Sequence, residues 1–95
     1  METGDQKLAA YLLGRMAAAE KALQTIIGSP RQGGYAELLQ ANFPMRREML
    51  GKDLIEFGLP DSLLPEARTG FVAQERMVYR GLQGGRFVPL APKER

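Results

Sequence analysis

The arginine side chains are the groups whose chemistry points most clearly to a function in this chain of 95 residues. Arg76 and Arg80 are four residues apart, a spacing that makes them neighbours on one face of a helix. A guanidinium group stays charged at neutral pH and carries five N–H donors, which suits it to phosphate and carboxylate oxygens. These residues therefore favour the binding of a polyanion over the making or breaking of covalent bonds.

Basic residues are concentrated toward the C-terminus. Residues 1–66 hold seven Lys or Arg against nine Asp or Glu, whereas residues 67–95 hold six against two, within a net charge of +2. The asymmetry is a reason to consider a phosphate backbone as partner. Charge alone is also typical of an ordinary solvated surface with a charged tail, which is the commoner case. The candidate nucleic-acid-binding residues are Arg46, Arg47, Lys52, Arg68, Arg76, Arg80 and Arg86.

Groups that could catalyse a reaction are scarce. The sequence has no Cys and no His, which removes thiol nucleophiles, the usual zinc ligands and the commonest proton-transfer group. Its two serines, Ser29 and Ser62, fall at expected helix boundaries. Asp53 and Glu56 are expected on a polar helix face, where solvation is the default. We therefore expect no enzymatic activity, no metal, no cofactor and no small-molecule substrate.

The chain shows no signal for a membrane or for secretion. Its apolar run from Leu8 to Leu13 is too short to span a bilayer, and no basic segment precedes it. The absence of Cys fits a reducing compartment. The expected location is the cytoplasm.

A long helix is the best-defined element of the sequence. Thr3 and Gln6 have the spacing of a capping box, and the chain favours helix from there to Ile27, before Gly28-Ser29-Pro30. Apolar residues then recur at alternating spacings of three and four, which predicts that they form the core face of a bundle helix; a coiled-coil dimer is the less common alternative. This apolar seam consists of Ala9, Leu12, Met16, Ala19, Leu23 and Ile26. Gly14, Ala17 and Ala18 are small enough to let another helix approach closely.

Two shorter helices are expected in the middle of the chain. The first covers Tyr35 to Ala41 and ends at Asn42; the second begins at Pro44 and ends at Gly58. Two apolar stripes lie on different faces of the second helix, so this helix is either sandwiched inside the domain, which is the commoner case, or has one side left for a partner. One stripe is Leu50, Leu54 and Phe57, and the other is Met45 and Met49. The candidate protein-interface residues are Met45, Met49, Leu12 and Met16.

The last helix is expected to be amphipathic. It covers residues 61–82, with Phe71, Val78 and Leu82 on its core side and Arg76 and Arg80 on its outer side. A hairpin that pairs residues 77–82 with 87–90 across Gly84-Gly85 is a competing interpretation. The fold class is therefore all-α. We expect a compact bundle of three to four helices over residues 1–85 and an extended C-terminal tail over 86–95.

The order of these features resembles a known family. The run Ala10-Tyr11-Leu12-Leu13-Gly14-Arg15 is similar to the opening helix of the C-terminal helical domain of the type I-C CRISPR large subunit. That domain is also made separately as the small subunit of the interference complex, Cascade. The later matches in type and order are Gly28-Ser29-Pro30, Tyr35, Leu38, Leu39, Met49-Leu50, Lys52, Pro60, Leu63, Glu66 and Phe71. The family's Tyr-Tyr-His-Gln-Arg run keeps only aromatic and Arg character here, between Gln74 and Tyr79.

The resemblance implies a non-catalytic, all-α small subunit in antiviral defence. Its partners would be the other subunits of a ribonucleoprotein complex and the backbone of crRNA and of target or displaced DNA. An alternative from the residues themselves is a small regulatory or phage-encoded adaptor that binds a protein and self-associates through its long first helix.

Overall fold

Helix α1 (Gly4–Gly28) forms the longest element of the computed structural model, which describes residues 3–29, 34–83 and 86–87. The predicted capping box is confirmed, because the Thr3 hydroxyl accepts from the Gln6 backbone N–H and the Gln6 side chain accepts from the Thr3 N–H. Together these bonds satisfy two of the donors that a helix N-terminus leaves unpaired. The helix ends where the Gly-Ser-Pro sequence predicts, with Ser29 in an extended conformation.

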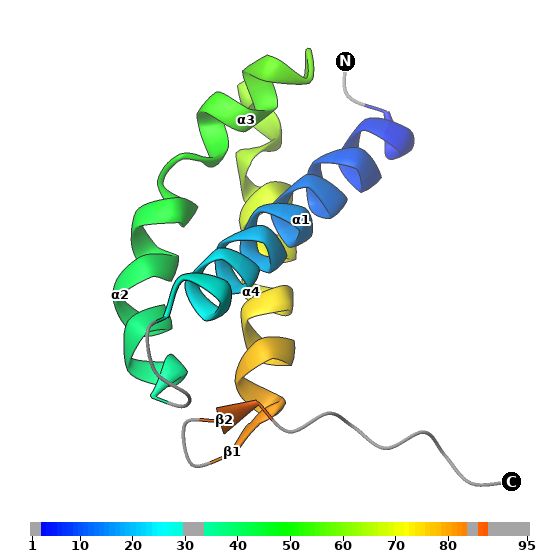
Figure 1. Cartoon of the computed structure of the whole chain (residues 1–95). Helices are drawn as coiled ribbons and strands as arrows, with labels where there is room; N and C mark the ends of the chain where they lie inside the picture. Colours follow the sequence, from blue (N-terminus) through cyan, green and yellow to red (C-terminus); the bar gives the residue numbers. More distant parts are fainter. Residues whose placement is uncertain (1–2, 30–33, 84–85, 88–95) are drawn as a thin grey trace, which may run out of the picture.

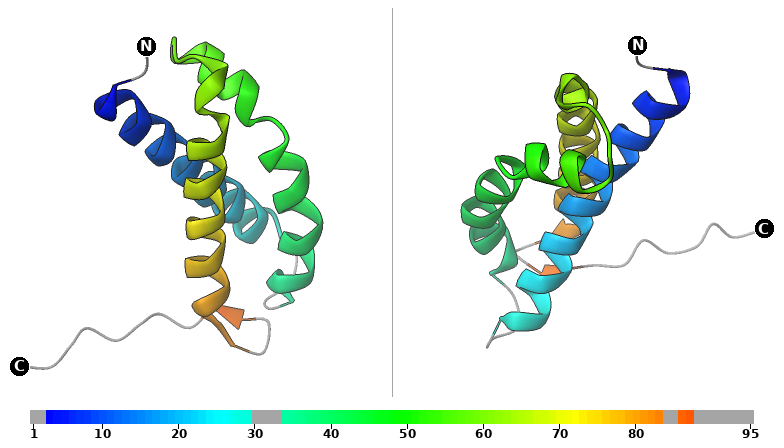
Figure 2. Two further views of the ribbon diagram at one scale, coloured as in Figure 1. Left: turned by 180° about the vertical axis from the view of Figure 1, so that it is seen from behind. Right: turned by 90° about the horizontal axis from the view of Figure 1, so that it is seen from above.

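Helix α1 crosses helix α4 (Leu64–Arg80) at very short range, and Figures 1 and 2 show the crossing from opposite sides. A Cβ atom added to Gly14 would lie 1.8 Å from the carbonyl oxygen of Ala67, and one added to Gly70 would lie 1.9 Å from that of Tyr11. Both glycines therefore allow backbone-to-backbone contact. The expectation that Gly14 and its small neighbours admit a second helix is confirmed.

This contact turns the predicted seam of α1 away from the core, so the prediction that the seam is a core face is wrong. Leu12, Met16 and Leu23 are 46%, 62% and 57% exposed. The buried side of α1 consists instead of Ala10, Leu13, Gly14, Ala17, Ala18, Ala22 and Thr25. Small residues face inward because only they permit the short approach to α4, and the larger apolar residues are left outside.

Helix α2 (Tyr35–Arg47) continues through Asn42 and Pro44, where the sequence predicts one helix to end and another to begin. Proline inside a helix removes one hydrogen bond and usually costs about 3 kcal/mol. Tertiary contacts outweigh that cost: Phe43 is fully buried, and the Asn42 amide donates to the Thr25 hydroxyl at 2.9 Å. The predicted boundary is wrong, and the break falls at residues 48 and 49 instead.

Helix α3 (Leu50–Glu56) follows this break, and the predicted helix stop at Gly58 is confirmed two residues after its end, where Gly58 has a left-handed φ of 72°. Leu50 and Leu54 are fully buried, but Phe57, the third member of their stripe, is 65% exposed. The helix ends one residue before Phe57, so this side chain does not continue the buried face of α3. Met45 and Met49 are exposed as well, so the interpretation of this segment as sandwiched inside the domain is wrong.

A short 3₁₀ turn, η1 (Asp61–Leu63), leads into α4, and Pro65 lies in the first turn of that helix. The helix ends at Arg80, so the helical interpretation is confirmed for residues 77–80. A smaller hairpin follows it, in which β1 (Leu82–Gln83) pairs antiparallel with β2 (Arg86–Phe87). The predicted bounds of 61 and 82 are wrong, because residues 61–63 form the 3₁₀ turn and Leu82 belongs to a strand. Residues 88–95 of the predicted tail lie outside the described residues.

The core forms where α1, α2 and α4 meet (Figure 2). The Phe43 ring contacts the rings of Phe71 and Tyr79 edge-to-face, with centroids 5.8 and 5.7 Å apart. Leu39, Leu50, Leu54 and Leu63 complete the layer of fully buried large side chains. The chain is an all-α bundle of four helices with a short terminal hairpin over the described residues.

Candidate nucleic-acid interface

Three exposed arginines follow the outer side of α4, and we call this surface the arginine face: Arg68, Arg76 and Arg80. Arg76 and Arg80 are four residues apart and therefore adjacent, whereas Arg68 lies eight residues before Arg76 and is rotated from it by about 80° around the same outer side; the three cover about 18 Å along the helix axis. None of them forms an ion pair within the described residues. The predicted outward direction of Arg76 and Arg80 is confirmed, and both guanidinium groups are available to an anion.

Small and apolar side chains lie between these arginines. Thr69, Val72 and Ala73 line a shallow hollow together with Arg68 and Arg76. The Thr69 hydroxyl donates to the Pro65 carbonyl at 2.9 Å, so its hydrogen is already used within the helix. The hollow between Arg68 and Arg76 is lined by no carboxylate, so the positive charge of these two arginines is not neutralised within it.

Arg46 and Arg47 lie differently, because carboxylates from other segments neutralise both. Arg46 is 2.6 Å from Asp53, and the side chains of this pair are only 15% and 16% exposed. Arg47 is 3.5 Å from Glu75, and its guanidinium lies 5.9 Å from the centre of the Phe71 ring. Breaking a partly buried ion pair destabilises the fold, because it leaves one charge without its partner. These two arginines therefore stabilise the packing of α2 against α3 and α4.

Burial explains why Glu75 needs this partner. Removal from water raises the pKa of the Glu75 carboxyl, and the positive charge of Arg47 partly offsets the rise. Burial also raises the pKa of Tyr79, and the negative charge of Glu75 adds to that effect. Arg47 therefore keeps the Glu75 carboxylate charged at the edge of the core, and removing Arg47 would leave that charge isolated.

The remaining predicted basic residues, Lys52 and Arg86, lie on other elements than the arginine face. Lys52 is exposed on α3, and Arg86 lies in β2 with its side chain outside the described residues. Arg47 and Arg68 do line one shallow depression with Pro44 and Glu48, which links α2 to the near end of the arginine face. The interface that the structure brings together is thus smaller than the set of seven predicted residues.

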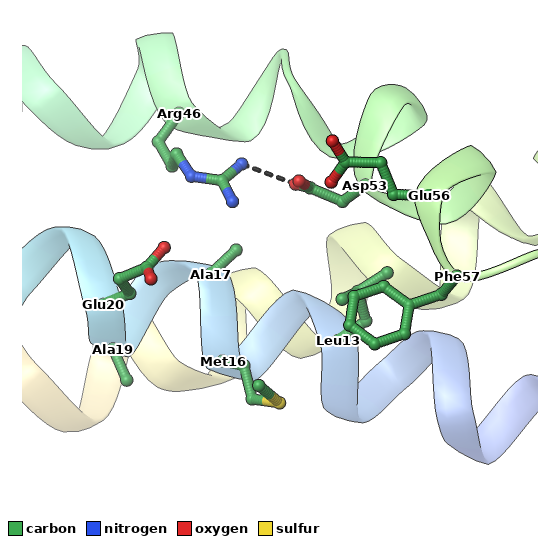
Figure 3. Close-up of a pocket in the computed structure, with 9 residues that line it drawn as sticks. All are labelled: Leu13, Met16, Ala17, Ala19, Glu20, Arg46, Asp53, Glu56 and Phe57. Atoms are coloured by element: carbon green, nitrogen blue, oxygen red, sulfur yellow. Dashed lines mark hydrogen bonds and ion pairs between the residues drawn. The ribbon is translucent and has the colours of Figure 1, made fainter.

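A groove between α1 and the α2–α3 segment is the other candidate site (Figure 3). The Arg46–Asp53 pair spans one wall, and Glu20 of α1 and Glu56 of α3 also line it. Leu13, Met16 and Phe57 form its apolar part. Because its arginine is already paired and its other charges are carboxylates, the groove favours an apolar or basic occupant over a phosphate.

The four predicted protein-interface residues, Leu12, Met16, Met45 and Met49, are all exposed. The sequence interpretation left six other large, apolar and exposed residues out of this set: Leu8, Leu23, Ile27, Ile55, Phe57 and Met77. For Ile27 and Leu8 a signal was present, since both flank the seam of α1. No sequence signal predicted the exposure of Met77, because its surroundings depend on where α4 crosses α1.

Comparisons with protein-family models, with curated proteins and with solved structures found no match. Within the described residues there is no group of three or more Asp and Glu side chains placed to hold a metal ion. None of the helices in that part of the chain combines the length and apolarity of a membrane span.

Proposed function

We propose that this chain is a non-catalytic protein that binds the sugar-phosphate backbone of nucleic acid through the arginine face of α4. The observation that carries the proposal is the contrast between two kinds of arginine. Arg46 and Arg47 are paired with carboxylates, whereas Arg68, Arg76 and Arg80 are exposed on the outer side of one helix and form no ion pair within the described residues.

Backbone contact fits this geometry better than base recognition does. Three guanidinium groups along about 18 Å of helix match the scale of about five nucleotides at 3.4 Å each. Phosphate contacts fix position without reading sequence, and the face lacks the Asn, Gln or aromatic side chains that read or stack on bases. The expected partner is therefore single-stranded or double-stranded DNA or RNA without sequence preference.

The sequence resemblance supplies a cellular setting for this proposal. In it, the chain is a cytoplasmic small subunit of a type I CRISPR interference complex and supports the target or displaced DNA strand beside the crRNA. Met45 and Met49 are exposed, and neighbouring subunits could cover them. A gene position beside CRISPR effector genes would support this setting, and the binding proposal itself does not require it.

Replacing the three arginines with glutamine, Arg68→Gln/Arg76→Gln/Arg80→Gln, is expected to reduce the salt dependence of DNA binding. Loss of three phosphate contacts should lower the slope of log affinity against log salt by about 2.7 for duplex DNA and by about 2.1 for single strands. The measurement is a fluorescence anisotropy titration with both kinds of DNA at 50 and 200 mM salt.

The matched control is Arg68→Lys/Arg76→Lys/Arg80→Lys, which keeps the charge and is expected to keep most of the slope. All three residues are exposed, so neither variant should change the helical circular dichroism signal. Wild-type affinity and slope in the glutamine variant would overturn the proposal, as would the absence of any DNA binding by the wild-type chain.

A second candidate function, a small regulatory or phage-encoded adaptor that binds a protein, is supported by a separate observation. Ten large apolar side chains are exposed among the described residues, and half of them lie on α1. This function predicts no nucleic-acid affinity, so the same titration separates the two.

A further inference from the structure

One side of α1 has no partner within the chain. Five large apolar side chains are exposed along it, and we call them the α1 strip: Leu8, Leu12, Met16, Leu23 and Ile27. The strip lies opposite the small residues that pack on α4, and it runs for most of a helix of 25 residues, about 37 Å. A continuous apolar stripe of this length on an otherwise folded protein marks an interaction surface.

The spacing along this side fits a second copy of the same helix. Apolar positions alternate by three and four residues from Ala9 to Ile26, which is the pattern of side chains that interlock between two helices. The pattern also alternates in size. Suppose that two copies run antiparallel, so that residues whose numbers add to 35 face each other. Each layer then contains either one large and one small side chain or a pair of leucines. The layers are Ala9 with Ile26, Leu12 with Leu23, and Met16 with Ala19.

We propose that the chain forms a homodimer in which the α1 helices of two copies pack antiparallel through the α1 strip. A parallel arrangement would pair each residue with itself. Ala9 and Ala19 would then make layers of alanine only, and Met16 would face Met16. Antiparallel packing fills the layers evenly, and its twofold axis closes the assembly at two copies.

The edges of the strip agree with this arrangement. Arg15 lies on one edge, but its guanidinium donates to the Gln74 side chain and to the Met77 sulfur, at 3.2 and 3.1 Å, and so is held against α4. Glu20 lies on the other edge, beside the groove between α1 and α3. No charged side chain stands in the centre of the strip between Leu8 and Ile27.

The area of the α1 strip determines how strongly two copies are expected to associate. A footprint of about 37 Å by 10 Å gives roughly 700 Å² over two copies, which is below the range of about 1,200–2,000 Å² for stable interfaces. Phe57 and Met77 flank α1 and add exposed apolar area. The dimer is therefore weak and depends on concentration. The inference concerns α1 alone and is independent of nucleic-acid binding through α4.

Sedimentation velocity across a concentration series tests the dimer. The wild-type chain should shift from monomer to dimer as concentration rises, and Leu12→Asp/Leu23→Asp should stay monomeric throughout. The control Ile55→Asp removes an exposed apolar side chain outside the strip and should dimerise like the wild type. Circular dichroism of dilute samples confirms that each variant is folded. A wild-type chain that stays monomeric, or a strip variant that dimerises normally, would overturn the proposal.

Disulfide formation tests the orientation, and the natural chain has no Cys to interfere. Leu12 and Leu23 of different copies meet in the antiparallel dimer, whereas the two Leu12 residues are about 16 Å apart along the axis, beyond the reach of a disulfide. A mixture of Leu12→Cys and Leu23→Cys chains should therefore crosslink, and each variant alone should not. Crosslinking of each variant alone at the rate of the mixture would overturn the antiparallel arrangement.

Discussion

Gly14→Ala is expected to lower the free energy of unfolding by at least about 3 kcal/mol, the upper part of the range for overpacked cores. The added Cβ would lie 1.8 Å from the Ala67 carbonyl oxygen and 2.9 Å from the Phe71 backbone nitrogen. Neither atom belongs to a flexible side chain, so two helices of the core must separate to make room. Alanine gains about 1 kcal/mol in helix propensity, which is too little to offset the clash.

Gly51→Ala is the matched control for this variant. Gly51 also lies inside a helix, α3, but a Cβ added there meets nothing within 4 Å. This substitution should leave stability unchanged or raise it by up to about 1 kcal/mol. Urea denaturation followed by circular dichroism measures both. Equal stabilities for the two variants would mean that α1 and α4 do not cross at Gly14.

Phe43→Ala is expected to lower the free energy of unfolding by about 3–5 kcal/mol, the usual cost of a large cavity at a buried aromatic residue. Phe43 is fully buried, and its ring is the shared partner of Phe71 and Tyr79. Removing the ring leaves both of these side chains without one neighbour. The loss is a large part of the stability of a small domain, which is about 5–15 kcal/mol.

Phe57→Ala is the control for the loss of an aromatic side chain, since Phe57 is mostly exposed. Its effect should remain below about 1 kcal/mol. Thermal and urea denaturation at low protein concentration measure both phenylalanine variants. A Phe43→Ala chain as stable as Phe57→Ala would contradict a core centred on the three aromatic rings.

Local signals made the ends of α1 predictable. The capping box at Thr3 and the Gly-Ser-Pro sequence act within a few residues of themselves, so their effect does not depend on the rest of the fold. The glycine stop at Gly58 and the proline in the first turn of α4 belong to the same class. For this reason both ends of α1 and the stop after α3 follow from the sequence, whereas the boundary between α2 and α3 does not.

The orientation of α1 could not be predicted, because two of its faces compete. Large apolar residues at heptad spacing normally form the core, and that rule assigned Leu12 and Leu23 to the inside. The structure buries the small face instead, because Gly14 meets the Ala67 backbone and Gly70 meets the Tyr11 backbone. The complementarity of two glycines on helices more than 50 residues apart is a tertiary property, which periodicity within one helix does not contain.

The same reason limits the prediction of the candidate site. The outward direction of Arg76 and Arg80 follows from the apolar side of their own helix. The ion pairs of Arg46 with Asp53 and of Arg47 with Glu75 depend on how α2 packs against later segments. Counting the basic residues of the sequence therefore overestimates the positive charge that is available to a phosphate backbone.

The orientation of α1 decides both the core and the outer surface, and two adjacent alanines test it directly. Ala18 is fully buried and Ala19 is exposed. Ala18→Cys and Ala19→Cys make the same chemical change one residue apart in a chain without other thiols. In a solution dilute enough to keep the chain monomeric, a thiol reagent should modify Cys at position 19 freely and Cys at position 18 at least about a hundredfold more slowly. Equal rates, or a faster reaction at position 18, would contradict the account.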